Sequence, residues 1–510
     1  MSTSPDFAAF ASVYEAGTPQ VVWTKLVADL ETPVSAYIKL ADGRANSFLL
    51  ESVEGGSVRG RYSIIGLKPD VIWRCAKGKA AINRRARSDA QAFEPLDGRP
   101  LETLRTLVRE CQMELPKDLP PMASGLFGFL GYDMVRDMER LPDKNPDPIG
   151  LPDAIMVRPT IVCIFDRLDD VVTLVTPVWP QAGTNARAAY EAATERLADA
   201  VSDFERSLPF RRESADALDE LPPPQANMSE ADFKKMVEVC KEYIRAGDAF
   251  QIVPSQRFSV PFKLPPLSLY RSLRRINPSP FLIFFDYGDF TIVGSSPEIL
   301  VRLRDNTVTI RPLAGTIARG ATPEEDKRLA DKLLADPKEH AEHLMLLDLA
   351  RNDVGRVSKL GSVRVVEQFT IEKYSHLQHI SSHVEGTLED GLDAIDALKA
   401  GFPAGTLSGA PKVRAMEIIE ELEPVRRGIY AGCAGYFAAN GSMDTCILLR
   451  TALVKDEVMY VQAGVGVVAD SDLEAEFQES HLKARALVRA AEEAVRFASN
   501  RSWTGGNTRR

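Results

Sequence analysis

The strongest constraint on the fold is a run of four apolar segments, separated by short polar turns, in the middle of the chain. These segments occupy residues 282–285, 291–295, 299–304 and 307–311. Each has the length of a β-strand and is too short for a typical helix. Strands joined by such short turns pair in antiparallel fashion, because a parallel pair needs a crossover of about a dozen residues or more. The sequence therefore predicts an antiparallel sheet at the centre of the fold.

Further strands and helices alternate along the rest of the chain. Helices are expected at residues 100–112, 184–208, 231–245, 324–335, 337–351, 392–400, 411–423 and 472–498. Further strands are expected at residues 47–52, 60–66, 71–74, 79–83, 125–133, 160–165, 171–177, 249–258, 376–385, 430–438, 444–454 and 457–463. This mixed order predicts an α+β fold, with large antiparallel β-sheets packed as a sandwich and helices outside.

A proline-rich segment divides the chain into two regions. Residues 209–227 contain three consecutive prolines, which forbid a helix and favour an extended, exposed linker. The expected organisation is therefore an N-terminal region, 1–208, and a C-terminal region, 228–510.

Composition and charge exclude several classes of protein. The net charge of −10 over 510 residues leaves no basic surplus for binding nucleic acid. The N-terminus lacks the basic and apolar regions of a signal peptide, and no apolar run is long enough to span a bilayer. The six cysteines are scattered in apolar surroundings, which predicts buried, reduced thiols. A soluble, cytoplasmic protein is expected.

Two pairs of glutamates stand at the starts of expected helices: Glu339 with Glu342, and Glu476 with Glu479. Residues three apart share one face of a helix. Carboxylates without cysteine favour Mg²⁺, which usually takes one or two protein carboxylates, so the other glutamates would support the ligands or move protons. Two solvated helix faces rich in glutamate are the alternative. Glu339 also follows Asp336 by three residues, where a capping-box glutamate would lie.

Histidine is concentrated in the last third of the chain, at positions 340, 343, 376, 379, 383 and 481. Because histidine transfers protons near neutral pH, this distribution indicates chemistry in the C-terminal region. His376, His379 and His383 suggest zinc as an alternative, but no H-E-x-x-H motif is present. On a strand, positions 379 and 383 also lie too far apart to bind one ion easily.

Two glycine-bearing loops and one arginine favour an anionic ligand. Residues 405–412 lead into an expected helix, whose free N–H groups and dipole attract a carboxylate or phosphate. Residues 462–468 offer a second stretch of accessible backbone, and Arg450 can hold a carboxylate through two hydrogen bonds. With the glutamate pairs, these features predict a Mg²⁺ site for a small dicarboxylate.

Several longer motifs occur in a specific order: GDAFQIVPSQR (247–257), SSPE (295–298), RPLAGT (311–316), DLARND (348–353), GTLSGAPK (405–412) and QAGVG (462–466). Together they resemble the chorismate-binding enzymes, and within that family the large subunits of anthranilate synthases. The resemblance covers nearly the whole chain. It implies amination of chorismate with ammonia and elimination of pyruvate to give anthranilate, the first step of tryptophan biosynthesis. It also assigns residues 228–510 to the catalytic domain.

The resemblance implies a role for each glutamate. Glu342 and Glu479 would bind Mg²⁺ directly, and Glu339 and Glu476 would be their neighbours. Glu339 would also be a candidate proton donor to the departing 4-hydroxyl group. His379 is similar to the family's histidine that acts in pyruvate elimination.

The same resemblance implies the substrate contacts. Tyr430 and Arg450 would hold the enolpyruvyl carboxylate, and Gly464 and Gly466 would present backbone N–H groups. Thr316, Thr406 and Lys483 would complete the pocket, with Thr406 among the catalytic residues.

Two positions separate branches of this family. Isochorismate and salicylate synthases carry a water-activating lysine where this chain has Gln251, and aminodeoxychorismate synthases often carry a lysine where it has Ala314. The absence of both lysines favours ammonia as nucleophile and the anthranilate route. Aminodeoxychorismate synthase component I, of the folate pathway, is the alternative within the family. A non-catalytic, tryptophan-sensing subunit is an alternative of a different class.

The N-terminal region resembles a site for feedback inhibition by tryptophan. The residues implied are Glu51, Ser52, Pro280, Phe281, Leu282, Gly435 and Tyr436. Glu51 would pair with the ammonium group of the inhibitor. Phe281-Leu282 stands where Tyr-Met is usual, which bears on the affinity for tryptophan. Because no glutaminase motif is visible, a separate glutamine amidotransferase subunit is expected to supply ammonia within a hetero-oligomer.

Overall fold

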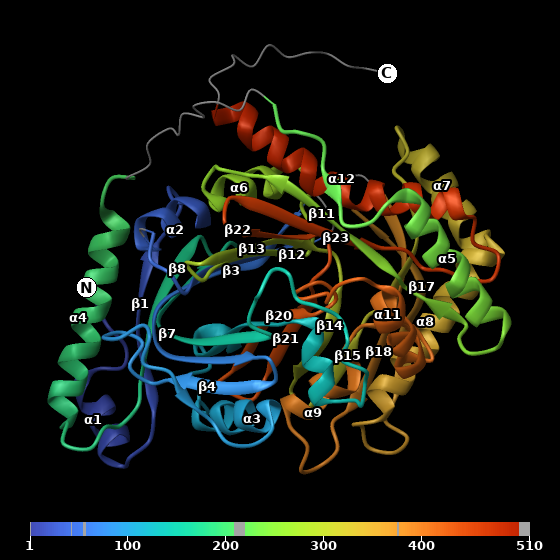
Figure 1. Ribbon diagram of the computed structural model, residues 1–510. Helices are drawn as coiled ribbons and strands as arrows, with labels where there is room; N and C mark the ends of the chain where they lie inside the picture. Colours follow the sequence, from blue (N-terminus) through green and yellow to red (C-terminus); the bar gives the residue numbers. More distant parts are fainter. Residues whose placement is uncertain (1, 42, 55–57, 209–219, 375–376, 499–510) are drawn as a thin grey trace.

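The strands form one antiparallel network that folds into two packed leaves. The computed structural model describes residues 2–41, 43–54, 58–208, 220–374 and 377–498. In this part of the chain every strand pair is antiparallel. Figure 1 shows the strands in the interior and the helices around them, which confirms the predicted α+β sandwich.

The first leaf contains the strands that pair with β2, β11 and their neighbours. It comprises β1 (Gln20–Val27), β2 (Ser47–Glu54), β8 (Val171–Val178), β9 (Gln225–Ala226), β11 (Ser255–Pro261), β12 (Phe281–Asp286), β13 (Phe290–Ser296), β22 (Thr451–Lys455) and β23 (Val458–Gly464). Two long strands, β3 (Val58–Ala76) and β7 (Ala154–Asp166), pass from this leaf into the second. Their register shifts between Pro69 and Val71, and such a bulge bends a strand pair.

The second leaf carries the remaining strands of the large sheet. It comprises β4 (Lys79–Asn83), β5 (Glu94–Pro95), β6 (Gly125–Leu130), β14 (Ile299–Arg304), β15 (Thr307–Ile310), β16 (Leu313–Ala318), β17 (Arg364–Lys373), β18 (Leu377–Thr387), β20 (Cys433–Ala438) and β21 (Met443–Ile447). A separate pair is formed by β10 (Gln251–Ile252) and β19 (Gly409–Ala410).

Side-chain alternation along the strands builds three layers of core. Phe48 of β2 points between the leaves and stacks on Phe127 of β6, with ring centroids 4.6 Å apart. Leu49, the next residue, points outward into the core beneath the helices of the first leaf. Leu126 does the same beneath the helices of the second leaf. This period of two is the expected consequence of strand geometry.

Helices cover both outer faces of the sandwich. The first leaf is covered by α1 (Phe7–Glu15), α2 (Pro33–Ala41), α4 (Ala186–Glu205), α6 (Pro266–Ile276) and α12 (Leu473–Ala498). The second leaf is covered by α3 (Pro100–Glu110), α8 (Pro337–Gly355) and α9 (Ala394–Gly401). The remaining elements are α5 (Glu230–Arg245), α7 (Pro323–Ala335), α10 (Gly405–Ser408), α11 (Lys412–Leu422) and the 3-10 turns η1 (Pro121–Ala123) and η2 (Tyr132–Asp137). In Figure 1, α6 and α12 lie at the top, and α3 and α9 at the bottom.

The two regions predicted on either side of residues 209–227 are joined by sheet pairing. Strand β2 pairs with β12, and β6 pairs with β20. Within the expected linker, residues 209–219 lie outside the described residues, and Gln225–Ala226 adds β9 to the edge of β11. The two regions therefore share one sheet and do not have separate cores. Their division into domains 1–208 and 228–510 by function stays a prediction.

Several expected elements differ in the structure. The strands expected at 60–66 and 71–74 are one strand, β3, and the strand expected at 125–133 ends at Leu130, before η2. The single strand expected at 444–454 is two strands, β21 and β22, separated by a turn at which Arg450 adopts a φ of 50°. The loop expected at 401–411 contains the short helix α10 and strand β19. The six cysteines are buried free thiols, as predicted. Within the described residues, no helix is long and apolar enough to span a membrane.

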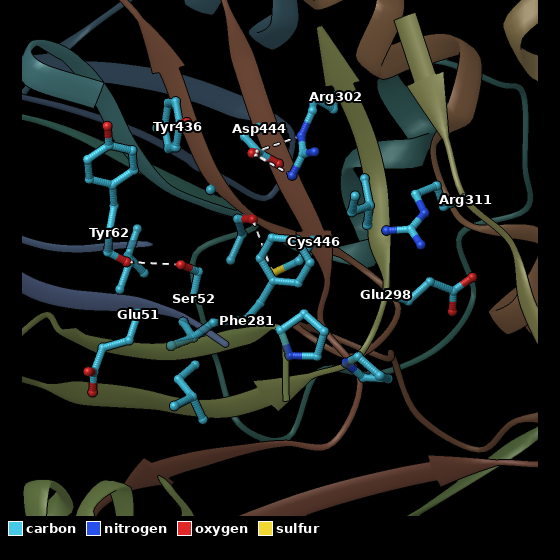
Figure 2. Close-up of a pocket in the computed structure, with 18 of the residues that line it drawn as sticks. Glu51, Ser52, Tyr62, Phe281, Glu298, Arg302, Arg311, Tyr436, Asp444 and Cys446 are labelled. Carbon is cyan, nitrogen blue, oxygen red and sulfur yellow. Dashed lines mark hydrogen bonds and ion pairs between the residues drawn. The ribbon is translucent and has the colours of Figure 1, made fainter. Parts of the chain in front are cut away.

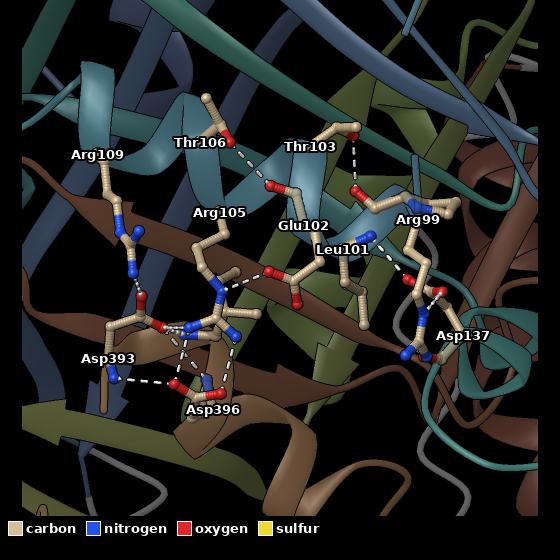
Figure 3. A network of polar contacts seen from close by, with 12 residues as sticks. Arg99, Leu101, Glu102, Thr103, Arg105, Thr106, Arg109, Asp137, Asp393 and Asp396 are labelled. Carbon is tan, nitrogen blue, oxygen red and sulfur yellow. Dashed lines mark hydrogen bonds and ion pairs between the residues drawn. The ribbon is translucent and has the colours of Figure 1, made fainter. Parts of the chain in front are cut away.

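A cluster of ion pairs fastens α3 to the start of α9 (Figure 3). The Arg105 guanidinium donates to Asp393 Oδ1 at 2.6 Å and to both oxygens of Asp396 at 2.7 Å. The same two aspartates form the capping box of α9. The hydrogen bonds that Arg105 donates to Asp396 raise the pKa of Arg105, so the contact is charged throughout the physiological range. This cluster connects helices that are far apart in sequence.

We expect Arg105→Ala to lower the free energy of unfolding by about 2 kcal/mol, because it removes the shared cation from a half-buried pair of carboxylates. Urea denaturation measures this change. The matched control is Arg109→Ala, which removes one more exposed contact to Asp393 at 3.1 Å and should cost less than about 1 kcal/mol. An equal loss of unfolding free energy in the two variants would show that the contact of Arg105 with both aspartates adds no stability beyond a single exposed ion pair.

Candidate active site between helices α8 and α12

Helix α8 begins at the cap expected from the sequence, but the side chain of Glu339 does not take part in it. The Asp336 side chain accepts hydrogen bonds from the backbone N–H of Lys338 at 2.9 Å and of Glu339 at 3.2 Å. The backbone N–H of Asp336 donates to Leu333 O of the preceding helix, which leaves the Glu339 carboxylate free. The capping-box prediction for Glu339 is therefore wrong.

The carboxylates of α8 and α12 converge. Burial raises the pKa of Glu339, and the neighbouring charges of Glu342, Asp336 and Glu479 raise it further. Glu479 lies on α12, so a charge of that helix acts on Glu339 of α8. Accumulated negative charge of this kind favours a cation between the helices.

Glu342 and Glu479 are each held by one polar partner. Gln251 Nε2 donates to Glu342 Oε1 at 3.1 Å. Lys483 Nζ lies 2.8 Å from Glu479 Oε1 and also donates to Gly464 O at 3.0 Å. A Cβ at Gly466 would lie 2.7 Å from Gln251 Nε2 and 3.7 Å from Glu342 Oε1. The structure therefore brings these predicted site residues together.

The fourth glutamate, Glu476, is buried behind Glu479. Its Oε2 atom has no hydrogen-bond partner in the part of the chain that the structure describes, and burial raises its pKa. Among the described residues, no three His, Cys, Asp or Glu side chains are close enough to hold a metal ion together. A cation bound by Glu342 and Glu479 would therefore need water or substrate oxygens to complete its coordination, and Mg²⁺ usually binds in this way, with one or two protein carboxylates.

Strands β16 and β18 place a neutral histidine beside Glu339. Thr316 Oγ1 lies 2.9 Å from His379 Nδ1, and Gly315 O lies 3.3 Å from the same nitrogen. Burial and the charge of Arg450 lower the pKa of His379 to about 4, so its ring is neutral at pH 7. Gly315 has a φ of 70°, and a Cβ there would lie 3.0 Å from Glu339 Oε2. His376, from the zinc alternative, lies outside the described residues.

Glu298 is a site residue that the sequence reasoning missed. It lies between β13 and β14, accepts a hydrogen bond from the Thr406 hydroxyl at 3.3 Å, and is 7 % exposed. Burial raises its pKa to about 8, so the carboxyl is protonated at neutral pH. The available signal was one acidic residue within an otherwise apolar segment, 292–301, where an unpaired charge would be costly.

Arg450 faces the same site with an unpaired guanidinium. The turn between β21 and β22 holds it in the left-handed region, and its carbonyl accepts from Ser295 N at 3.1 Å. Among the described residues, no acceptor lies within hydrogen-bonding distance of the guanidinium. Burial lowers the pKa of Arg450, while the nearby Tyr374 and Glu298 raise it. A half-buried cation without a partner among the described residues is a ready site for a carboxylate.

Tyr430 and Gly464 form the opposite wall. Burial raises the pKa of Tyr430 to about 12, so its phenol stays protonated. A Cβ at Gly464 would lie 2.7 Å from Tyr430 OH and 2.9 Å from Pro254 O. Glycine is therefore required where β23 passes the phenol, and the backbone there can approach a ligand closely.

A cavity of about 650 Å³ lies between the two leaves, next to this site (Figure 2). Its lining includes Glu298 and Tyr374 at one end. All the residues implied in inhibitor binding line it as well: Glu51, Ser52, Pro280, Phe281, Leu282, Gly435 and Tyr436. The antiparallel register of β2 and β12 places Ser52 opposite Phe281.

Glu51, the expected ammonium partner, is already held by other side chains. Its carboxylate accepts hydrogen bonds from Arg274, from Arg167 at 2.7 Å and from Tyr270 at 2.7 Å. These donors lower its pKa despite burial. Figure 2 shows the carboxylate on the side away from Tyr436 and Asp444. Both oxygens of Glu51 therefore already accept hydrogen bonds, and its role as partner for a ligand's ammonium group stays a prediction.

Asp444 offers a carboxylate on the other side of this cavity. Its Oδ2 accepts from Arg302 at 3.0 Å and from Arg304 at 3.2 Å, whereas Oδ1 is buried without a partner. An unsatisfied buried acceptor is costly and can be satisfied by a donor on a ligand. Asp444 is likewise paired with two arginines, but within the described residues its Oδ1 accepts no hydrogen bond, which makes it a second candidate for the ammonium role.

Comparison with known proteins gives consistent matches. Residues 48–489 match the family model of the chorismate binding enzymes. The chain is 58% identical to anthranilate synthase component 1 of Cereibacter sphaeroides over 96% of this chain and 98% of that protein. It is 47% identical to the Pseudomonas putida protein of the same name, over 91% of this chain and 93% of that protein.

Solved structures show the same architecture. Anthranilate synthase component I from Streptococcus pneumoniae superposes with a TM-score of 0.74 at 36% identity, covering 91% of this chain and 99% of that one. The menaquinone-specific isochorismate synthase of Escherichia coli has a TM-score of 0.69 at 19% identity, covering 95% of this chain and 99% of that one. The second likeness concerns the fold alone.

Proposed function

Because the chain belongs to the chorismate binding enzyme family, we propose that it is the synthase component of an anthranilate synthase, which converts chorismate to anthranilate. The observation that carries this proposal is the meeting of a protonated carboxyl, Glu298, a neutral imidazole, His379, and an unpaired guanidinium, Arg450, in one site. Chorismate requires such a set, because it carries two carboxylates, a hydroxyl leaving group and an enolpyruvyl ether. The overall change consumes chorismate and ammonia and releases anthranilate, pyruvate and water.

Each group has a task in this reaction. Arg450 and the Tyr430 phenol hold the enolpyruvyl carboxylate, with the backbone N–H groups of Gly464 and Gly466 alongside. Glu298 gives its proton to the departing 4-hydroxyl as ammonia attacks the ring, a role that its pKa of about 8 suits. Glu339 remains a candidate for this step, but it is only half-buried. His379, neutral at pH 7, accepts the ring proton as pyruvate leaves.

The remaining residues support this arrangement. Thr406 holds Glu298, Thr316 orients His379, and Lys483 fixes Glu479 against β23. Glu342 and Glu479 would hold Mg²⁺, with Glu339 and Glu476 beside them. The bound ion would supply positive charge to the ring carboxylate of chorismate.

Product identity tests this function. Purified protein with chorismate, ammonium and Mg²⁺ should form fluorescent anthranilate and pyruvate in equal amounts. Accumulation of 4-amino-4-deoxychorismate would favour the aminodeoxychorismate synthase alternative, and no turnover would favour the tryptophan-sensing subunit. The absence of lysine at Gln251 and Ala314 supports anthranilate. Gln251 lies in the site itself, against Glu342.

The relatives' designation as component 1 implies a second component. A glutamine amidotransferase subunit is the proposed partner, since the reaction consumes ammonia and the chain shows no glutaminase motif. The complex would be a hetero-oligomer in the cytoplasm.

Tryptophan is the proposed inhibitor, bound in the cavity between the leaves. Phe281, Pro280 and Leu282 would contact the indole on one side, and Gly435 and Tyr436 would close the other. A cavity of about 650 Å³ is large enough for this amino acid. Since Glu298 lines the same cavity, an occupant would lie against the wall of the catalytic site.

We expect Asp444→Asn to weaken inhibition by tryptophan about tenfold or more and to leave kcat with ammonia unchanged, because the substitution removes a charge from the ammonium partner. Inhibition curves with ammonium as nitrogen source measure this effect. Glu51→Gln is the comparison, and it should lower thermal stability by leaving Arg274 and Arg167 poorly neutralised. Unchanged inhibition of Asp444→Asn would contradict the assignment of the ammonium partner.

A further inference from the structure

A buried ion pair lies directly behind the catalytic site, at the end of α11. Arg427 and Glu423 side chains are 1% and 3% exposed. Arg427 Nε donates to Glu423 Oε2 at 3.0 Å, and Nη2 donates to Oε1 at 2.6 Å. Taking two charges fully out of water is costly, so stability alone does not explain this pair. Its other contacts indicate what it does.

Arg427 connects two segments that carry site residues. Nη1 donates to Leu407 O at 2.7 Å, and Nη2 donates to Val253 O at 2.6 Å. Leu407 follows Thr406, and Val253 follows Gln251 by two residues. The two segments also bond to each other, since Val253 N donates to Ser408 O at 3.0 Å. The planar guanidinium thereby fixes the separation of Thr406 from Gln251.

Glu423 connects a third segment. Its Oε1 accepts from both the backbone N–H and the hydroxyl of Ser255, each at 2.8 Å. Ser255 pairs with Gly464 across β11 and β23, and its hydroxyl also accepts from Gln462 Nε2 at 2.8 Å. The carboxylate therefore holds the end of β23, where Gly464 passes Tyr430.

The guanidinium also lies against the aromatic ring that contacts substrate. Its carbon is 5.5 Å from the centroid of Tyr430 and 4.9 Å from that of Tyr132. A cation in this position restrains both rings. One pair of charges thus holds the positions of four site residues: Thr406, Gln251, Gly464 and Tyr430.

We propose that the Arg427–Glu423 pair is a positioning device, which sets Tyr430 and Gly464 relative to Thr406 and Gln251 so that the site receives the enolpyruvyl carboxylate of chorismate. This inference rests on the proposed function for the identity of the ligand. Neither residue touches the reacting atoms. A misplacement of about 1 Å in such an arrangement can cost about a hundredfold in rate.

The decisive variant removes both charges. Replacing a buried pair by apolar residues often preserves or raises stability, so Arg427→Met with Glu423→Leu should fold with a thermal midpoint at least equal to that of Arg427→Met alone. We expect kcat/KM for chorismate to fall about a hundredfold, with KM raised, because the site elements lose their common anchor. Tryptophan affinity should not change.

The matched control is the Arg136–Glu420 pair. Glu420 lies on α11, one turn before Glu423, and Arg136 lies in η2. The N–O distance of the pair is 2.8 Å and its side chains are 16% and 7% exposed. Glu420 accepts hydrogen bonds from the backbone of Lys144 and Asn145, and neither of these residues belongs to the proposed site. Arg136→Met with Glu420→Leu should leave kcat/KM within about threefold, because it removes comparable charges without touching the site.

The outcomes separate clearly. A folded Arg427→Met, Glu423→Leu protein with wild-type kcat/KM would overturn the proposal. Should that protein misfold, Arg427→Lys decides, because lysine keeps the charge but not the fork of donors. A tenfold loss of kcat/KM at an unchanged thermal midpoint supports the proposal, and wild-type activity overturns it.

Chorismate affinity, measured by calorimetry, requires no turnover. If the wild-type protein binds chorismate but forms no anthranilate, the proposed function is refuted and the positioning role is not. If the Arg427→Met, Glu423→Leu protein binds chorismate with wild-type affinity, the positioning role is refuted and the proposed function is not.

Discussion

Glu298→Gln is expected to lower kcat about a thousandfold while leaving the fold intact. The amide can keep the contact with Thr406 but cannot donate a proton to the departing hydroxyl, and general acid catalysis typically contributes factors of about 10² to 10⁴. Anthranilate fluorescence under saturating chorismate and ammonium measures kcat. Because the variant replaces a buried carboxyl by an isosteric neutral group, its thermal midpoint at pH 7 should equal or exceed that of the wild type.

The pH dependence identifies the acid. Glu298 keeps its proton up to a pKa of about 8, so wild-type kcat should fall as the pH rises through that value. The same shift affects stability: the folded protein retains a proton that the unfolded chain loses near 4.5, so this group's contribution to stability declines between pH 4.5 and 8 and is then constant. Both trends should disappear in Glu298→Gln.

Glu339→Gln is the informative comparison, because Glu339 is the other candidate for this step. Its substitution should lower kcat by a smaller factor, and kcat should still fall as the pH rises through about 8, the alkaline limb of the pH profile. If instead Glu339→Gln removes that limb and Glu298→Gln keeps it, the roles of the two carboxyls are the reverse of those proposed.

Chelation of divalent cations with EDTA should abolish activity, and added Mg²⁺ should restore it. Glu342→Gln and Glu479→Gln should each lower kcat/KM by about a thousandfold or more at physiological Mg²⁺, because each removes one of two protein ligands from a site with few others. Chorismate affinity by calorimetry, with and without Mg²⁺, provides a second readout. In the wild type the affinity should depend on the ion.

Glu474→Gln is the matched control on the same helix. Glu474 is exposed and pairs with Lys234, so its loss should not change the Mg²⁺ dependence. Full activity of the wild type in EDTA would contradict a metal site at the starts of α8 and α12. A loss in Glu474→Gln equal to that in Glu479→Gln would indicate a general effect of acidic charge.

Several features of the site were predictable because they depend on short stretches of chain. The Asp336 cap, the start of α8 and the shared face of Glu339 and Glu342 follow from neighbouring residues alone. The break at Pro254 between β10 and β11 follows from the missing N–H of proline. The motifs that resemble the chorismate-binding family supplied the remaining site residues.

Other features depend on residues that are distant in sequence. The charge on Glu51 is balanced by Arg167 and Arg274, which lie more than a hundred residues away, so no local pattern could predict these contacts. The strand expected through Arg450 is broken, because the chain turns there to present the guanidinium. Strand propensity is a weak guide where tertiary contacts determine the backbone.

By itself, the sequence determined the class of fold, the order of its elements and the family, because alternation, caps and motifs are local properties of the chain. Only the tertiary structure decided that Glu298 is a protonated acid, that Arg450 has no partner among the described residues, and that Arg427 and Glu423 join three site segments. Protonation and pairing depend on burial and on which charges meet, and those are set when strands and helices from distant parts of the chain pack together.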